Sequence, residues 1–271
     1  MTTLQAILYG ALQGLAEFLP ISSSGHLALA HIWFGASDAE HLSFDVLLHF
    51  ATLISVAVSY RKDIFLLCKG GIAFAARVCG RNKSPKTDGE KLFLLLVIAS
   101  LPLLPASLLA DRLEQLGNNL FIVGTLLICN GLLLLCSDAL PAGTRVPEQL
   151  SGLRALFIGC TQMFGILPGI SRSGATITGG RIGGLSGEGA VRFSFLLSIP
   201  AVLGASVLKL PAFFARGIDR TTALSCFAGF LTAFLVGLGA IRLLRLVSEK
   251  KGCTWFGLYT IAIGLVAVLT R

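Results

Sequence analysis

The sequence predicts an all-α integral membrane protein, a single polytopic domain over residues 1–271. Hydrophobic residues make up 54% of the chain and charged residues 13%, a balance that water-soluble domains of this size do not show. Several apolar segments approach the roughly 20 residues that a helix needs to cross a bilayer, and they do not alternate like the short strands of a membrane barrel. We expect about six transmembrane helices and two re-entrant helical hairpins, an inverted repeat.

Charge and cysteine content narrow the functional classes. The net charge of +8 does not indicate a nucleic-acid partner, because the basic residues gather in the connections between apolar segments, as the positive-inside rule describes. We therefore expect membrane lipids and no nucleic acid around this protein. The seven cysteines lack the paired spacing of zinc or disulfide sites, and we interpret them as small buried hydrophobic residues.

The first hairpin is expected at the start of the chain. Residues 4–16 form an apolar helix that is too short to cross comfortably, and it meets the breaker Leu19-Pro20. Ser22 is suited to cap a second short helix that continues to about residue 34. Such a broken pair is tolerated at membrane depth only where protein or a water-filled cavity covers the loose backbone.

Three spans are expected after this hairpin, at about 42–60, 92–110 and 119–137. The connection at 61–91 carries eight Lys or Arg against three acids, so we expect a cytoplasmic loop there. Four residues in it are expected to break helices: Gly70, Gly71, Gly80 and Pro85.

The second half repeats this order. A short apolar helix at 153–166 is broken by Pro168-Gly169, and a segment rich in small residues at 171–185 completes the second hairpin. Glu188 and Arg192 are four residues apart, which favours a local ion pair. Further spans are expected at about 189–208 (interrupted by Pro200), 221–244 and 254–270.

The two hairpins suggest an inverted repeat with halves of about 1–137 and 150–271. Ser24-Gly25 and Ser173-Gly174 align at an offset of 149 residues, and each hairpin is followed by three spans; such repeats place their sites where broken helices meet. The basic connection from Arg242 to Lys251 is also expected in the cytoplasm. Both termini are then extracytoplasmic, and the first hairpin enters from outside.

Polar residues of the first hairpin form one half of a candidate site, since ionisable groups at membrane depth indicate function. Gln13 and Glu17 share a helix face and can offer oxygens to a hard cation or a water, although a pair at the membrane interface is the alternative. Ser22, Ser23 and Ser24 precede His26 at a helix start, where an anion is favoured and a hydroxyl can act as nucleophile. Simple capping is the alternative for these serines.

Arg172 is the centre of the other half. It lies between Ser171 and Ser173, where a guanidinium is suited to bidentate contact with phosphate. Snorkelling to the lipid headgroups is the alternative. Thr176 is expected to join the two serines as a phosphate ligand. Among the other histidines, we expect interfacial positions for His31 and His41, and leave His49 open because Asp45 lies one helical turn before it.

The segments E-F-L-P-I-S-S-S-G-H and P-G-I-S-R-S-G-A-T resemble the two signature motifs of the bacterial undecaprenyl-diphosphate phosphatases of the bacitracin-resistance type. The resemblance implies a phosphoric anhydride hydrolase that removes the terminal phosphate of the C55 isoprenyl diphosphate, recycling the lipid carrier of cell-wall synthesis and conferring bacitracin resistance. It also implies a multi-pass protein of the bacterial inner membrane, with its active site open to the extracytoplasmic side.

Roles for individual residues follow from the same resemblance. The implied catalytic residues are Glu17, Ser23, His26 and Arg172, and the implied phosphate-binding residues are Ser22, Ser24, Ser171, Ser173 and Thr176. A divalent cation, Mg²⁺ or Ca²⁺, is implied at Glu17 and Gln13, where many members carry a second glutamate in place of Gln13. We favour Ser23 as nucleophile, with His26 exchanging its proton, over direct attack by water.

A carrier is the rival function, since paired broken helices also occur in transporters. A flippase for the polyprenyl phosphate would need Arg172 as well, whereas it would not need a nucleophile. The serine run beside Glu17 and His26 therefore favours hydrolysis. The sequence leaves open whether the protein forms a homodimer.

Overall fold

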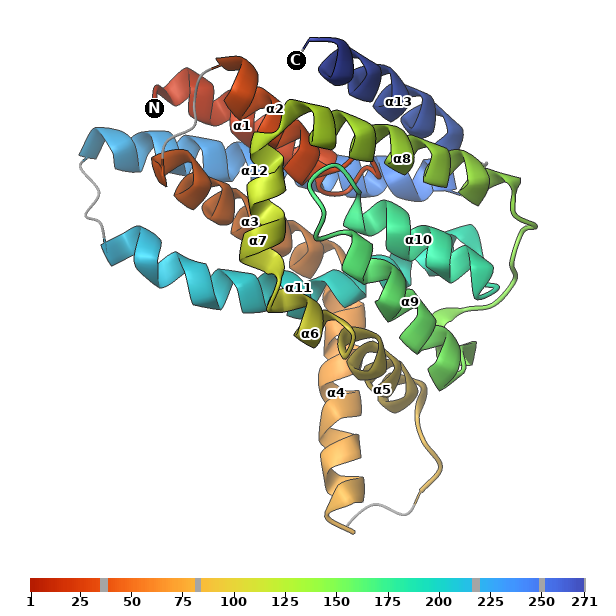
Figure 1. The fold of residues 1–271 in the computed structure, drawn as a ribbon. Coiled ribbons are helices and arrows are strands. Elements are labelled where there is room, and N and C mark those ends of the chain that lie inside the picture. The colour runs from red at the N-terminus through yellow and green to blue at the C-terminus, as the bar shows by residue number, and fades with distance from the viewer. Residues whose placement is uncertain (35–38, 81–83, 216–219, 249–251, 271) are drawn as a thin grey trace.

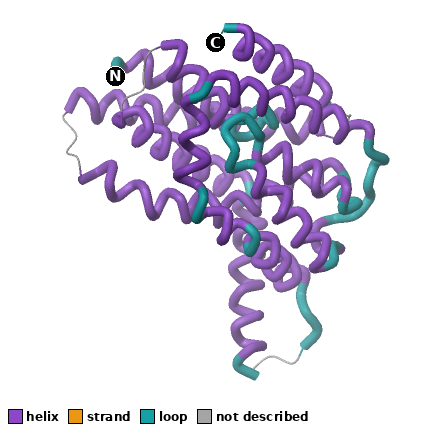
Figure 2. The backbone as a smooth tube through the Cα atoms, in the orientation of Figure 1, coloured by secondary structure: helices purple, strands orange, loops and turns teal. Residues whose placement is uncertain are grey.

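The computed structural model describes residues 1–34, 39–80, 84–215, 220–248 and 252–270. These residues form helices joined by turns and loops, with one isolated bridge between Arg145 and Leu185 (Figure 2). The all-α class that the composition predicts is confirmed.

The helices are, in chain order (Figure 1), α1 (Thr3–Ala16), α2 (Ser23–Phe34), α3 (Ala39–Ser59), α4 (Arg61–Val78), α5 (Asp88–Ser100), α6 (Leu103–Ser107), α7 (Ala110–Glu114), η1 (Gln115–Asn118), α8 (Leu120–Ala139), η2 (Pro147–Gln149), α9 (Gly152–Phe164), α10 (Arg172–Ile182), α11 (Gly187–Ala215), α12 (Arg220–Ser248) and α13 (Cys253–Leu269).

Both expected pairs of short helices are present. In the first, α1 and α2 are joined by a break that contains Pro20, and in the second, α9 and α10 are joined by a break that contains Pro168. The helices of each pair contact one another. The chain bends at the prolines because a proline lacks the N–H that a continuing helix needs.

Three helices in the described part of the chain are long and apolar enough to cross a membrane, namely Leu120–Ala139, Gly187–Pro211 and Thr222–Ser248. The segment Phe44–Ser59 reaches this level only together with Arg61–Val78, from which it is bent by 85°. The length and apolar composition of these helices indicate a multi-pass membrane protein. The count of six spans stays a prediction.

Prolines act differently in two of the expected spans. The continuous span expected at 92–110 is wrong, because α5 ends at Ser100 and the prolines at 102 and 105 leave only the short helices α6 and α7. In α11, by contrast, Pro200 and Pro211 lie inside one helix of 29 residues. Packing against neighbouring helices, which the sequence does not display, decides between these outcomes.

The loop expected at 61–91 is also wrong over most of its length. Residues 61–78 form α4, which packs on α5 and projects from the rest of the bundle (Figure 1). A Cβ on Gly70 would lie 2.2 Å from the carbonyl oxygen of Gly89. The glycine therefore serves a close contact between two helices and does not break one.

Glycines also place α13 against α8, which lie side by side in Figure 1. A Cβ on Gly124 would lie 2.8 Å from the oxygen of Gly264, and a Cβ on Gly264 would lie 2.6 Å from the oxygen of Gly124. Gly131 and Gly257 meet in the same reciprocal way, at 2.5 and 2.8 Å. Small residues at such positions let helix backbones approach closely in membranes.

Two smaller expectations are corrected by the packing. Five of the seven cysteines are exposed, and only Cys226 and Cys253 are buried; a bilayer covers apolar side chains, so they need no protein cover. Arg192 does not pair with Glu188, because its guanidinium binds Asp63 and Glu148 from other elements at 2.6 and 2.8 Å.

Candidate active site

The candidate site lies where the breaks of the two hairpins meet. A Cβ on Gly25, at the start of α2, would lie 2.9 Å from the Cα of Gly169 in the second break. Gly169 has a φ of 120°, which glycine adopts without a steric penalty. Two segments more than 140 positions apart in the sequence are thus brought into contact.

Asn130 of α8 joins the two breaks. Its Nδ2 donates to the carbonyl oxygen of Pro20 at 2.9 Å, and its Oδ1 accepts from the backbone N–H of Ser171 at 2.9 Å. The side chain is fully buried. A buried backbone group left without a partner costs about 1–3 kcal/mol, so one amide satisfies two groups that neither hairpin can satisfy by itself.

The backbone at Ser22 turns the first break into α2. Ser22 has a φ of 73°, an uncommon value for a residue with a side chain, and its hydroxyl accepts from the N–H of Gly25 at 3.2 Å. The Ser24 hydroxyl lies 3.4 Å from that of Ser22. Capping is thus a role that the structure shows for Ser22, and it leaves Ser23 free to face the site.

Glu17 is the centre of the cluster. One carboxylate oxygen, Oε2, accepts from Ser23 Oγ at 2.7 Å and from Gln13 Nε2 at 3.0 Å. The same oxygen lies 3.2 Å from His49 Nδ1, which is 2.8 Å from Gln13 Nε2. Gln13 and Glu17 are buried, whereas Ser23 and His49 are partly exposed.

The other oxygen of Glu17, Oε1, accepts a hydrogen bond from the guanidinium of Arg172, in an ion pair across the two hairpins. The side chain of Arg172 is 20% exposed, so it is not wholly enclosed by the cluster. A Cβ on Gly165 would lie 2.6 Å from the Cα of Arg172. The glycine that ends α9 therefore makes room for the start of α10.

His26 is held from two sides. Its Nδ1 lies 2.9 Å from the carbonyl oxygen of Ser22, so Nδ1 carries the proton, and its Nε2 lies 3.0 Å from the hydroxyl of Tyr259 in α13. The two rings are almost parallel, at 10°. Among the described contacts, the hydroxyl of Ser23 goes to Glu17 and not to the imidazole.

The hydroxyls of the second hairpin mostly shape its backbone. Ser171 caps α10 by accepting from the N–H of Gly174 at 3.1 Å, and its hydroxyl lies 3.0 Å from that of Ser173. Thr176 donates to the carbonyl oxygen of Arg172 at 2.8 Å and lies 2.6 Å from the hydroxyl of Ser194. These three residues are buried next to Arg172, and their contact with a phosphate stays a prediction.

The remaining histidines have partners that the sequence did not predict, where the structure describes them. His31 is not merely interfacial, because its Nε2 binds Asp45 at 2.9 Å and its ring stacks on Tyr9. Asp45 thus binds His31, and His49 joins the Glu17 cluster. The side chain of His41 lies outside the described residues.

Sequence reasoning missed Asn130 and Tyr259. Asn130 is a lone amide in an apolar span, and buried polar residues in such helices often indicate function, so a signal existed for it. Tyr259 lies among aromatic residues near the end of the chain, where a membrane-interface position is the ordinary interpretation. No local signal separated it from that class.

A divalent cation can be tested against the oxygen donors of the cluster. No group of three or more His, Cys, Asp or Glu side chains able to hold a metal occurs among the described residues. The Oε1 atom of Gln13, however, is buried without a partner beside Glu17. One carboxylate and one amide oxygen suit a Mg²⁺ that takes its other ligands from water and substrate phosphates.

Comparison with known proteins gives one consistent result. A family model described as bacitracin resistance protein BacA matches residues 6–266. A protein of Alkaliphilus metalliredigens named undecaprenyl-diphosphatase is 37% identical over 99% of this chain and 98% of its own length. Proteins with the same name from Desulforapulum autotrophicum and Rubrobacter xylanophilus are 40% and 39% identical, covering 99% and 98% of this chain and 98% and 97% of their own. The chain belongs to the bacitracin resistance protein BacA family.

Proposed function

We propose that this protein is an undecaprenyl-diphosphate phosphatase, which hydrolyses the terminal phosphate of the C55 isoprenyl diphosphate. The names of its relatives support this activity. The observation that carries it is the contact of Glu17 with both Ser23 and Arg172, since it joins a hydroxyl, a base and a guanidinium at one point. A phosphoryl transfer needs these three groups together.

The terminal phosphate is proposed to take the place of Glu17 on the guanidinium of Arg172. Planar, bidentate contact would hold two phosphate oxygens and neutralise charge that develops in the transition state. Glu17, released from this ion pair, stays 2.7 Å from the hydroxyl of Ser23. In this arrangement Glu17, rather than the His26 that the resemblance implies, would take the Ser23 proton.

The proposed reaction has two steps. Ser23 Oγ attacks the terminal phosphorus, the bond from that phosphorus to the bridging oxygen breaks, and the lipid monophosphate leaves. A water then attacks the phosphorus of the phosphoserine, the bond from that phosphorus to Ser23 Oγ breaks, Glu17 returns the proton to Oγ, and inorganic phosphate leaves. We assign the proton of this water to Nε2 of His26, because Nδ1 donates to the carbonyl oxygen of Ser22 and Nε2 can exchange the Tyr259 hydroxyl for the water. Direct attack of water on the diphosphate remains the alternative.

A cation is proposed at Oε1 of Gln13 and the carboxylate of Glu17. When bound, it would neutralise part of the negative charge of the diphosphate. Gln13 contributes an uncharged ligand, so the protein would rely on substrate oxygens to complete the site.

The proposed location is the bacterial inner membrane, with the site open to the extracytoplasmic side. The support is the basic connections at 61–91 and from Arg242 to Lys251. In a chain without native cysteines, a cysteine placed after Arg271 should react with an impermeant reagent on intact cells, and a cysteine at position 84 should not. Labelling at position 84 would reverse the orientation.

Phosphate release by the purified protein in detergent tests the activity. We expect release from the C55 diphosphate, and loss of release when a chelator removes divalent cations. Transfer of the polyprenyl phosphate across vesicle bilayers without phosphate release would favour the flippase instead. Phosphate release that persists in chelator would contradict the proposed cation and would still support the phosphatase activity.

A further inference from the structure

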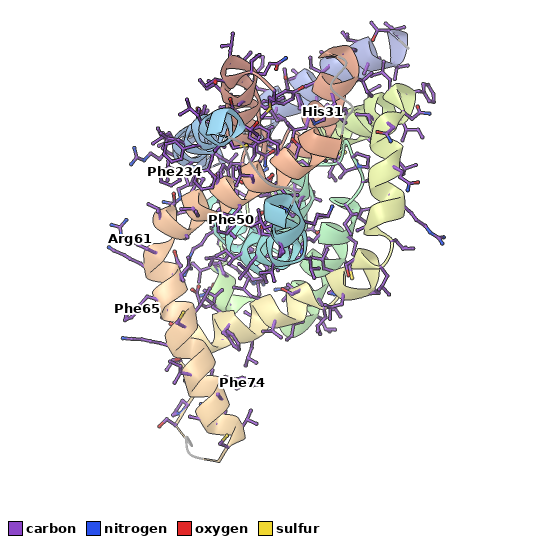
Figure 3. All side chains as sticks on the ribbon, turned by 90° about the vertical axis from the view of Figure 1, so that its left-hand side faces the viewer. His31, Phe50, Arg61, Phe65, Phe74 and Phe234 are labelled. Atoms are coloured by element: carbon purple, nitrogen blue, oxygen red, sulfur yellow. The ribbon has the colours of Figure 1, made fainter. Side chains whose placement is uncertain are left out.

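Helix α4 has an outward face without protein cover. Phe65 and Ile72 are 63% and 71% exposed. Figure 3 shows Arg61 and Phe65 on the side of α4 that faces away from the bundle, and Phe74 on the side toward α5. Phe74 contacts Phe93 of α5, with ring centroids 6.0 Å apart. The helix thus has a packed side and an open, partly apolar side.

The charges of α4 are divided between these two sides. Its one acid, Asp63, is bound to Arg192 of α11 at 2.6 Å. Arg77 is turned toward α5, where it binds Glu90. Lys62 and Lys69 are exposed, and neither has an acidic partner among the described residues. The open side therefore carries positive charge that its own acid does not neutralise.

The lysines and the apolar residues alternate along one stripe. Lys62, Phe65, Lys69 and Ile72 follow one another at intervals of three and four residues, so they lie on one face of the helix. The ammonium of Lys69 lies 4.4 Å from the centre of the Phe65 ring. Lysines at the edge of an apolar stripe can lay their stems on apolar surface and keep the charge in the headgroup layer.

The orientation of α4 is compatible with a position in the headgroup layer. It is bent by 85° from Phe44–Ser59, so a crossing α3 places α4 nearly parallel to the membrane plane. Five charged residues among its 18 make α4 unsuited to cross the bilayer itself. The cytoplasmic leaflet, where the basic connections are expected, attracts Lys and Arg through its anionic lipids.

We propose that α4 is an interfacial helix whose outward face binds an anionic lipid surface, with Phe65 and Ile72 in the upper acyl region and Lys62 and Lys69 at the phosphates. Because this face lies outside the candidate active site, the inference does not depend on the phosphatase activity.

The test places a single tryptophan on each side of α4 in the full-length protein. Trp33 and Trp255 are replaced by phenylalanine, and either Phe65→Trp or the control Phe74→Trp is added. The variants are reconstituted in vesicles of phosphatidylglycerol or of phosphatidylcholine that carry bromine at shallow or deep acyl positions. We expect several-fold stronger quenching at position 65 than at position 74, strongest with shallow bromines.

The charge requirement is tested by the double variant Lys62→Glu and Lys69→Glu. Its quenching at position 65 should fall in phosphatidylglycerol vesicles and change little in phosphatidylcholine. The pair Lys86→Glu and Lys91→Glu makes the same change in net charge elsewhere and should leave the quenching as it was. Equal quenching at 65 and 74, strongest quenching by deep bromines, or insensitivity to the lysine changes would each overturn the proposal.

Discussion

The two hairpins begin their second helices with the same serine cap, but they carry different side chains at the candidate catalytic positions. At the offset of 149 residues, Ile21-Ser22 corresponds to Ile170-Ser171, and Ser24-Gly25 corresponds to Ser173-Gly174. Ser22 and Ser171 each accept from the glycine N–H three residues later, at 3.2 and 3.1 Å. The residues that the hairpins share are therefore the ones that begin α2 and α10.

The residues that differ include the candidate catalytic residues. Glu17, Ser23 and His26 correspond to Ile166, Arg172 and Ala175. In the proposed mechanism the first hairpin would supply the base and the nucleophile, and the second would supply the guanidinium. We propose that the halves 1–137 and 150–271 are an inverted repeat in which one copy of the scaffold holds the phosphate and the other attacks it.

The largest expected effect is at Ser23. If its hydroxyl attacks phosphorus, Ser23→Ala should lower turnover ~10⁴-fold or more, and quenched wild-type reactions should contain phosphoserine at position 23. Ser100→Ala, in α5 and outside the candidate site, where the hydroxyl donates to the carbonyl oxygen of Leu96, is the control, and it should retain most activity. A loss of only ~10²–10³ at Ser23, the cost of one preorganised donor, without trapped phosphoserine, would assign the attack to water.

Arg172 should come next. Because an ammonium group does not reproduce bidentate contact, Arg172→Lys should lower turnover by ~10²–10³ while the protein inserts normally. Arg181→Lys in the same helix, whose guanidinium binds Asp138 at 2.5 Å, is the control and should affect stability more than turnover. Near-normal turnover of Arg172→Lys would show that Arg172 acts only through its positive charge and not through bidentate contact.

Asn130 tests whether the two hairpins act as one site. Asn130→Leu leaves the carbonyl of Pro20 and the N–H of Ser171 unpaired, so the breaks should shift, and a shift of this kind costs ~10²-fold in turnover. Thermal unfolding should also occur at a lower temperature. Ser137→Ala, two turns along the same face of α8, is the control. Unchanged turnover in Asn130→Leu would show that the breaks hold their positions independently.

The smallest effect is expected at Gln162, the counterpart of Gln13. Its side chain is buried, and both its polar atoms lack a partner among the described residues. Gln162→Met should leave turnover unchanged and stabilise the protein by about 1 kcal/mol, since an unpaired polar group is removed. Gln13→Met should lower turnover instead, because Gln13 binds Glu17. A destabilised Gln162→Met would indicate an ordered water or ligand at this amide.

The sequence by itself determined the membrane class, the two broken helix pairs and the polar residues of both breaks. These follow from local properties: apolar length, proline chemistry and the cost of ionisable groups in an apolar segment. Ser22 falls into the same group, since capping requires only a hydroxyl before a helix start.

The tertiary structure alone decided which residues meet. Glu17 and Arg172 form an ion pair although they are 155 positions apart in the sequence. No periodicity within either hairpin predicts this contact. The same holds for Asn130 between the breaks and for Tyr259 against His26. The sequence predicts Gly70 as a helix breaker, whereas in the structure Gly70 makes a close contact with Gly89. Glycine favours both breaks and close helix contacts, so only the neighbouring helix distinguishes them.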